Sequence, residues 1–102
     1  MTEQEFNALA DQTLAAIESA LDPMLDDLDF ESKPGGILEI EFPDGHKLII
    51  NRHSIAREIW VADRSGGFHF RPENGIWVDT RDGTELHSKL RSLLASHGAA
   101  GF

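Results

Sequence analysis

The chain has 102 residues and a mass of 11.3 kDa, the size of one domain, and its 40% content of hydrophobic residues lies in the globular range. Its 18 Asp and Glu against 9 Lys and Arg give a formal net charge of −9, which disfavours nucleic acids and anionic membrane surfaces as partners. The absence of cysteine excludes disulfides, thiol catalysis, thiolate zinc sites and cysteine-bound iron–sulfur clusters.

The amino-terminal segment, residues 2–21, has the periodicity of an amphipathic helix. Its apolar residues share one stripe at about 3.6 residues per turn; they are Phe6, Ala10, Ile17 and Leu21. Thr2 followed by Glu5 fits a capping box, which would satisfy free amides at the helix start. Pro23 then makes a continued regular helix unfavourable.

Alternating apolar and polar residues next predict six short strands. We place them at residues 27–31, 38–42, 46–51, 58–62, 68–70 and 76–79. Pro43-Asp44-Gly45 and Ser65-Gly66-Gly67 are typical hairpin turns, and short links of this kind favour antiparallel pairing.

A second amphipathic helix is predicted at residues 84–96, with Leu86, Leu90, Leu93 and Leu94 as its apolar stripe. Each helix has one apolar face to bury, so we expect a single α+β domain over residues 1–102. Its architecture would be a two-layer αβ sandwich, with both helices on one face of an antiparallel sheet of about six strands. The other face of the sheet would be open to water.

The densest chemical feature is a run of carboxylates from the exposed side of the first helix into the first strand. Its members are Asp11, Glu18, Asp22, Asp26, Asp27, Asp29 and Glu31. If these elements adjoin at the sheet edge, the carboxylates form one ridge, and hard cations that prefer oxygen ligands would relieve their mutual repulsion. Iron, calcium, magnesium, manganese and lanthanides all qualify. The alternative is a solvated face that only keeps the protein soluble, and the spacing lacks the EF-hand pattern.

The five histidines show no H-E-x-x-H pattern and no paired helical spacing, so a closed zinc site is not expected. We expect His87 and His97 to be surface residues of the second helix. His69 should point to the open sheet face, with His53 just beyond the third strand. The chain also lacks the nucleophile-elbow, phosphate-loop and dinucleotide-binding motifs, so no enzymatic activity is expected.

The two tryptophans receive opposite predictions. Alternation with Ile59 and Val61 places Trp60 on the open face of the sheet, whereas Trp77 is assigned to the core. An exposed Trp60 beside Asn51, Arg52 and His69 resembles a protein-binding hot spot, and these four residues are the predicted partner-binding set.

An ordered set of short motifs resembles the frataxin family. The motifs are Gly35-Gly36-Ile37-Leu38-Glu39-Ile40, Ile49-Ile50-Asn51-Arg52, Glu58-Ile59-Trp60-Val61, Ser65-Gly66-Gly67, Ile76-Trp77 and Asp82-Gly83. The opening Glu5-Phe6 and Leu9-Ala10-Asp11-Gln12 is similar to the start of the bacterial members. His53, Ile55 and Glu58 stand where the family usually has Gln, Pro and Gln.

The resemblance implies two helices on one face of an antiparallel sheet, and weak binding of Fe²⁺ or Fe³⁺ on the ridge. The metal-binding residues would be Glu18, Asp22, Asp26, Asp27, Asp29 and Glu31. It also implies a regulatory role in iron–sulfur cluster assembly, through contact with the cysteine desulfurase and the scaffold protein. The surface role of the family would fall on Asn51 and Trp60.

Two other interpretations stay open beside this one. The first is a purely electrostatic protein-interaction module without physiological metal binding. The second is a ferroxidase, which would need Glu-x-x-His pairs on helices that this chain lacks. We expect a monomer that iron could assemble into oligomers. With no apolar run near the ~20 residues of a membrane helix and no signal-peptide pattern, we expect a cytoplasmic protein.

Overall fold

The first helix begins where the capping pattern predicts. In the computed structural model, which describes all 102 residues, α1 (Glu3–Leu21) has Thr2 as its N-cap. The Thr2 hydroxyl accepts the Glu5 amide proton, and the Glu5 carboxylate accepts the Thr2 amide proton. A short 3-10 helix, η1 (Asp22–Met24), follows at Pro23, which cannot continue the α-helical hydrogen bonding. The predicted helix and its cap are confirmed.

Six antiparallel strands then form a meander in which each strand pairs with the next along the chain. They are β1 (Asp29–Lys33), β2 (Ile37–Glu41), β3 (Lys47–His53), β4 (Glu58–Asp63), β5 (Gly66–Glu73) and β6 (Ile76–Asp79), followed by α2 (Leu86–Ser96). The predicted element order is confirmed. β5 runs well beyond the predicted residues 68–70, because cross-strand pairing incorporates residues such as Pro72, opposite Trp77, that have no strand preference of their own.

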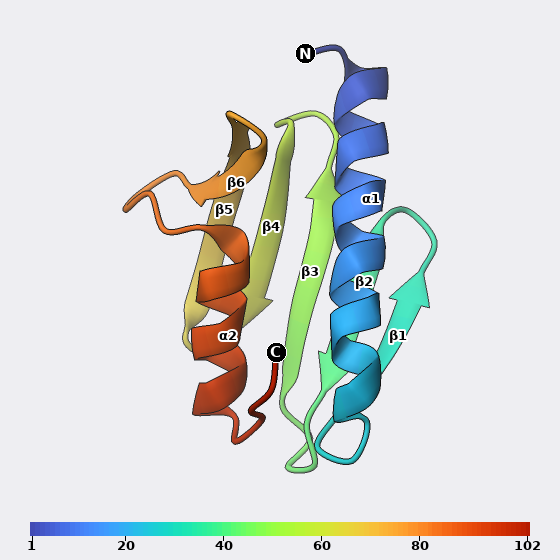
Figure 1. The fold of residues 1–102 in the computed structure, drawn as a ribbon, viewed down its shortest axis with the longest axis vertical. Coiled ribbons are helices and arrows are strands. Elements are labelled where there is room, and N and C mark those ends of the chain that lie inside the picture. Colours follow the sequence, from blue (N-terminus) through green and yellow to red (C-terminus); the bar gives the residue numbers. More distant parts are fainter.

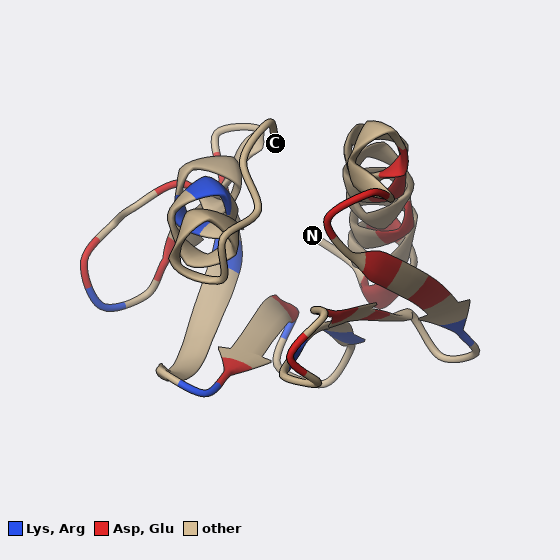
Figure 2. Ribbon diagram, turned by 90° about the horizontal axis from the view of Figure 1, so that it is seen from below, with Lys and Arg blue, Asp and Glu red and all other residues tan.

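Both helices cover the same face of the sheet, as predicted (Figure 1). Seen from below, α1 and α2 lie side by side above the strands, with nothing covering the opposite face (Figure 2). Alternation along the strands therefore divides the side chains between a covered face and an open face. On β3, for example, Leu48 and Ile50 are buried under the helices, whereas Lys47 and Ile49 are exposed.

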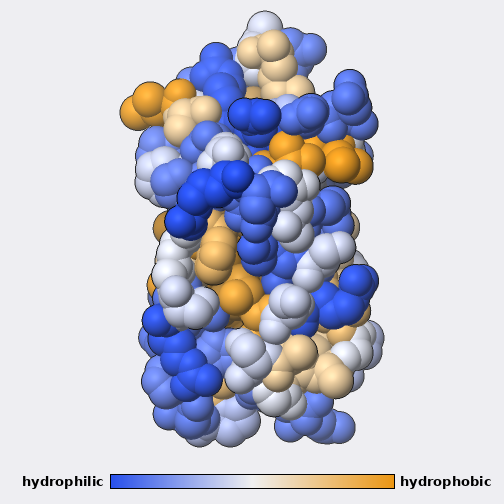
Figure 3. Space-filling model, turned by 90° about the vertical axis from the view of Figure 1, so that its left-hand side faces the viewer, coloured by the Kyte–Doolittle hydropathy of each residue, from blue (hydrophilic) through white to orange (hydrophobic).

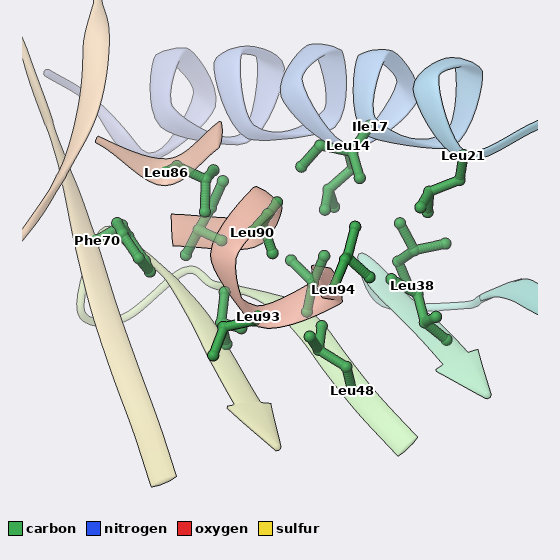
Figure 4. Packing of buried hydrophobic residues seen from close by; sticks show 14 of the residues in the cluster. Leu14, Ile17, Leu21, Leu38, Leu48, Phe70, Leu86, Leu90, Leu93 and Leu94 are labelled. Carbon is green, nitrogen blue, oxygen red and sulfur yellow. The ribbon is translucent and has the colours of Figure 1, made fainter. Parts of the chain in front are cut away.

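The core lies between the helices and the covered face. Leucines from both helices point toward strand residues such as Leu38, Leu48 and Phe70 (Figure 4). Leu14, absent from the predicted stripe, belongs to the buried face of α1. Trp77 is only 4% exposed and donates its indole N–H to the Thr13 hydroxyl at 2.9 Å, so the core prediction for Trp77 is confirmed.

The prediction of His97 as a surface residue of the second helix is wrong. His97 is the C-cap of α2, and its side chain is fully buried. Its ring stacks on Phe42 with centroids 4.0 Å apart, and its Nε2 lies 3.1 Å from the equally buried Asp63 carboxylate. The pair joins the end of α2 to the end of β4, a contact distant in sequence that no local pattern reveals.

The remaining surface is mostly hydrophilic. On the side formed by α2, β5 and the β6–α2 loop, apolar atoms appear as separate small areas (Figure 3). Exposed apolar side chains include Ile55, 90% exposed in the β3–β4 turn, and Ile76, 50% exposed on β6. No helix of the protein has both the length and the apolar character needed to cross a membrane.

Candidate functional site

The predicted metal-binding carboxylates follow one margin of the molecule. We call them the acidic ridge: Glu18, Asp22, Asp26, Asp27, Asp29 and Glu31. Glu18 lies on the last turns of α1, Asp22 opens η1, and Asp26 and Asp27 lie in the link to β1. The last two lie on β1, an edge strand paired only with β2. The structure thus brings the end of α1 and the start of the sheet together, which is the condition on which the proposed ridge depends (Figure 2).

Three shallow hollows succeed one another along this margin. Glu18 and Asp22 line the first, of about 490 Å³, together with Phe30. Asp26, Asp27 and Asp29 line a second, of about 310 Å³, and Asp29 and Glu31 a third, of about 350 Å³. The ion pairs nearby use other carboxylates, since Arg52 pairs with Asp11. The ridge oxygens are therefore available to solvent cations.

These carboxylates do not converge on one point. No group of three or more His, Asp or Glu side chains is arranged to hold a metal ion. Oxygen donors suit hard cations such as Fe²⁺, Fe³⁺ and Ca²⁺. Donors spread along an edge can attract such ions and hold them through one or two carboxylates and water, which is weak and exchangeable binding.

Two further carboxylates, Glu39 and Glu41 on β2, extend the acidic surface onto the open face. Sheet register places Glu41 opposite Asp29 and Glu39 opposite Glu31. Like charges directly opposite destabilise a strand pair. Sequence reasoning missed this juxtaposition, although the alternation of β2 and its hairpin link to β1 contained the signal.

Lysines compensate one of these two pairs. Glu39 accepts hydrogen bonds at 2.8 Å from both Lys33 and Lys47, on the strands flanking β2. The hydrogen bond from Lys33, which has the larger effect, and that from Lys47 lower the pKa of the Glu39 carboxyl to about 2. Asp29 and Glu41 accept no hydrogen bond from a lysine, although Lys47 lies opposite Glu41 on β3, so the repulsion between this pair is less fully compensated.

The second candidate site lies on the open face. Asn51, Trp60 and His69 occupy one cross-strand row, because Asn51 pairs with Trp60 and Trp60 with His69. The indole of Trp60 stacks between two imidazoles, those of His53 at 3.8 Å and His69 at 4.4 Å between ring centroids. The prediction that Trp60 lies on the open face is confirmed. The stacking partner His53 was missing from the predicted partner-binding set. Since it is two residues from Asn51 on β3, alternation places both side chains on the same face of the sheet.

Arg52 does not share this face, contrary to the grouping made from the sequence. Its position after Leu48 and Ile50 turns its side chain to the covered face, where the guanidinium pairs with Asp11 of α1. It passes so close to Gly36 that a Cβ there would lie 2.9 Å from Arg52 Nε. Arg52 therefore connects α1 to the sheet. Of the predicted partner-binding residues, only Asn51, Trp60 and His69 lie together.

Charge is unevenly divided between the two parts of the chain. Residues 1–44 contain 12 Asp and Glu and one Lys, whereas residues 45–102 contain six Asp and Glu and eight Lys and Arg. Acidic residues are concentrated on α1, the link to β1 and the first two strands (Figure 2). A molecule of this kind presents its α1–β1 side to positively charged partners.

Comparison with known proteins gives a consistent family. The family model described as a frataxin-like domain matches residues 1–99. The iron–sulfur cluster assembly protein CyaY of Dechloromonas aromatica is 62% identical over 99 residues, which cover 97% of this chain and 93% of the relative. The protein of the same name from Vibrio cholerae is 41% identical over 97 residues, covering 95% of this chain and 92% of the relative.

Solved structures agree in fold. The frataxin of Psychromonas ingrahamii superposes with a TM-score of 0.89 at 31% sequence identity, covering 99% of this chain and 96% of that one. A trimeric frataxin of the yeast Saccharomyces cerevisiae, complexed with ferrous iron, superposes with a TM-score of 0.69 at 29% identity. The match covers 91% of this chain and 84% of the yeast chain.

Proposed function

Because the chain belongs to the frataxin-like family, we propose that it is a non-enzymatic regulator of iron–sulfur cluster assembly that binds iron on its acidic ridge. The observation that supports iron binding is the ridge itself: six carboxylates follow one margin, while the nearby cations pair with Asp11 and Glu39. Unpaired carboxylates at one edge repel each other, and a bound hard cation lowers that repulsion.

Iron is cargo in this proposal. The donor set suits Fe²⁺ and Fe³⁺ because it consists of hard oxygen ligands, and its dispersion implies weak, exchangeable binding. The yeast relative with ferrous iron supports the choice of metal. Other hard cations would compete at the same carboxylates. Neutralising part of a net charge of −9 would also lower the repulsion between copies, so the monomer could oligomerise when iron is bound.

The proposed partners are the cysteine desulfurase and the scaffold protein of the assembly pathway. The acidic margin would dock on a basic patch of the desulfurase, and Asn51, Trp60 and His69 would supply contacts from the open face. A chain without cysteine can neither accept persulfide sulfur nor hold a cluster through thiolates. We therefore assign it an accessory role in the cytoplasm.

The test of iron binding is a titration of the whole protein with Fe²⁺ under anaerobic conditions, followed by NMR of the backbone amides. Amides from Glu18 to Glu31 should broaden or shift first. The Asp27→Asn/Asp29→Asn variant should weaken this effect severalfold. A matched control, Glu3→Gln/Glu73→Gln, removes two exposed charges away from the ridge and should respond like the unmodified protein. An unselective response over the whole surface would contradict the iron proposal.

Partner binding separates the proposal from the purely electrostatic module. A desulfurase assay with this protein added, with and without iron, measures both properties together. Under our proposal, Asp27→Asn/Asp29→Asn lowers the effect on the desulfurase and abolishes its dependence on iron. If partner binding weakens while the unmodified protein never shows a dependence on iron, the interaction module is the better description.

A further inference from the structure

The stack around Trp60 leaves little of the indole free. His53 of β3 and His69 of β5 lie nearly parallel to the Trp60 ring, at interplanar angles of 18° and 10°, and flank it from the two neighbouring strands. Both faces of the indole are therefore covered by imidazoles of the same chain. A partner meets the edges of three rings and the outer faces of the two imidazoles.

The polar edge of the indole is also occupied. Trp60 Nε1–H donates to Glu58 Oε1 at 2.7 Å, and the same oxygen lies 3.7 Å from His69 Nδ1. A proton on His69 Nδ1 would therefore bring a second donor to this carboxylate oxygen, beside the indole N–H. The protonation state of His69 is thus coupled to the hydrogen bond that orients Trp60.

His53 is coupled to the neighbouring turn in the opposite sense. Its Nδ1 accepts the Ala56 amide proton at 3.2 Å, which requires an unprotonated Nδ1. Protonation would place two donors against each other and end this hydrogen bond. The turn concerned carries Ile55, 90% exposed, and its other side-chain hydrogen bonds are those of Ser54 Oγ with Asn7 Oδ1 and of Arg57 with the Ser54 carbonyl.

The charges around the stack nearly cancel while both imidazoles are neutral. The charged groups near the stack are Glu58 from β4, Arg71 and Glu73 from β5, which lie 3.4 Å apart, and Arg57 of the β3–β4 turn. β3 and β6 contribute the neutral residues Asn51 and Val78 at the neighbouring register positions. Two protonations would add two positive charges to a surface that carries almost none.

Building on the proposed function, we propose that His53 and His69 make partner binding at the Trp60 face proton-dependent, with the neutral stack as the binding form. A basic partner is repelled by the two added charges, and loss of the hydrogen bond between His53 and Ala56 alters the turn that it contacts. Histidine is the side-chain type best suited to such a change of charge near neutral pH.

The test is the affinity for the purified cysteine desulfurase at pH 7.8 and pH 6.0, measured by calorimetry. Two charges about 8 Å from partner charges in water-like surroundings should weaken binding about fivefold at the lower pH. The His53→Gln variant should show about half of this pH effect on a logarithmic scale, and His53→Gln/His69→Gln almost none. His87→Gln, on α2, is the matched control and should keep the full ratio, which corrects for titration of the desulfurase itself.

The outcomes separate this inference from the proposed function. If the unmodified protein fails to bind the desulfurase at either pH, the proposed function fails. If it binds and the stack variants keep the full pH ratio, the inference is overturned. If the double variant does not bind at all, the ratio of affinities at the two pH values is compared between the His53→Gln variant and the unmodified protein, and an unchanged ratio overturns the inference. In the free protein, the Ala56 amide resonance must titrate together with the His53 ring, and independent titration would overturn the proposed coupling.

Discussion

At the scale of single residues, Gly36 and Arg52 depend on each other. Gly36 has φ of 76°, which disfavours any side chain, and a Cβ there would lie 2.9 Å from both Cβ and Nε of Arg52. We expect Gly36→Ala to lower the free energy of unfolding by about 2–5 kcal/mol, the sum of backbone strain and overpacking. The measurement is urea unfolding.

Neighbouring Gly35 provides the control, since it also has positive φ but would place its Cβ in open space. Gly35→Ala should therefore cost only the strain, about 1–2 kcal/mol. Adding Arg52→Ala to Gly36→Ala should recover part of the loss, so that the two substitutions are less than additive. Equal effects at both glycines would contradict a clash with Arg52.

Glu39 is the second residue with a specific consequence. Lys33 and Lys47 lower its pKa to about 2 from the ordinary 4.5, so the folded state favours its charged form. This stabilisation is complete above the unfolded value and is lost as the pH falls toward the folded value. Glu39→Gln should therefore lower the melting temperature at pH 6 and have little effect near pH 2.

Glu41→Gln is the matched control on the same strand and face. Glu41 lies between Asp29 and Lys47 in the register, so its neutralisation removes one repulsion and one attraction and should change stability little at pH 6. A loss equal to that of Glu39→Gln would show that the lysine pairs do not explain the effect. Melting curves at pH 6, 4 and 2 distinguish the two residues.

At the scale of elements, α2 depends on one buried polar contact at its end. Burial raises the pKa of Asp63, but hydrogen bonds from Ser65 and His97 outweigh it and leave that pKa below its ordinary value. His97→Ala would remove the ring stacked on Phe42 and leave the carboxylate without this partner. We expect a loss of about 2–4 kcal/mol in urea unfolding.

His87, on the same helix, gives the comparison. Its ring stacks on Phe102 at 5.9 Å between centroids and lines an open hollow beside α1, so His87→Ala should cost about 1 kcal/mol or less. Hydrogen exchange should show that His97→Ala loosens α2 while the centre of the sheet stays protected. Equal loosening of α1 and α2 would mean that His97 supports the whole core.

The elements were predictable from sequence because their signals are local. Periodicity predicted α1, α2 and the strands, and alternation placed Trp60 on the open face of the sheet. Contacts between distant segments were not predictable in the same way. His97 is buried because Phe42 and Asp63, both distant in sequence, pack against it. Arg52 was grouped with Asn51 because the two are adjacent in one motif, but neighbouring residues of a strand point to opposite faces of the sheet. The ridge was predicted as a margin, but its lack of a convergent ligand set needed coordinates.

At the scale of the whole molecule, the excess negative charge opposes folding. The first 44 residues carry a formal charge of −11 against +2 for the rest of the chain, and they also carry the directly opposed pair of Asp29 and Glu41. Repulsion of this kind acts in the compact state more than in the expanded unfolded chain. The same distribution that orients the protein toward a basic partner therefore lowers its stability when it is free.

The dependence of the melting temperature on salt should measure how far this repulsion lowers stability. Raising NaCl from 10 mM to 150 mM shortens the Debye length from about 30 Å to about 8 Å and screens repulsion along the ridge. We expect the melting temperature to rise by about 4 °C, equivalent to about 1 kcal/mol for a domain of this size. Asp27→Asn/Asp29→Asn should start higher and respond less, whereas Glu3→Gln/Glu73→Gln should respond like the unmodified protein. A melting temperature that falls with salt would mean that ion pairs such as those of Arg52 and Glu39 outweigh the repulsion.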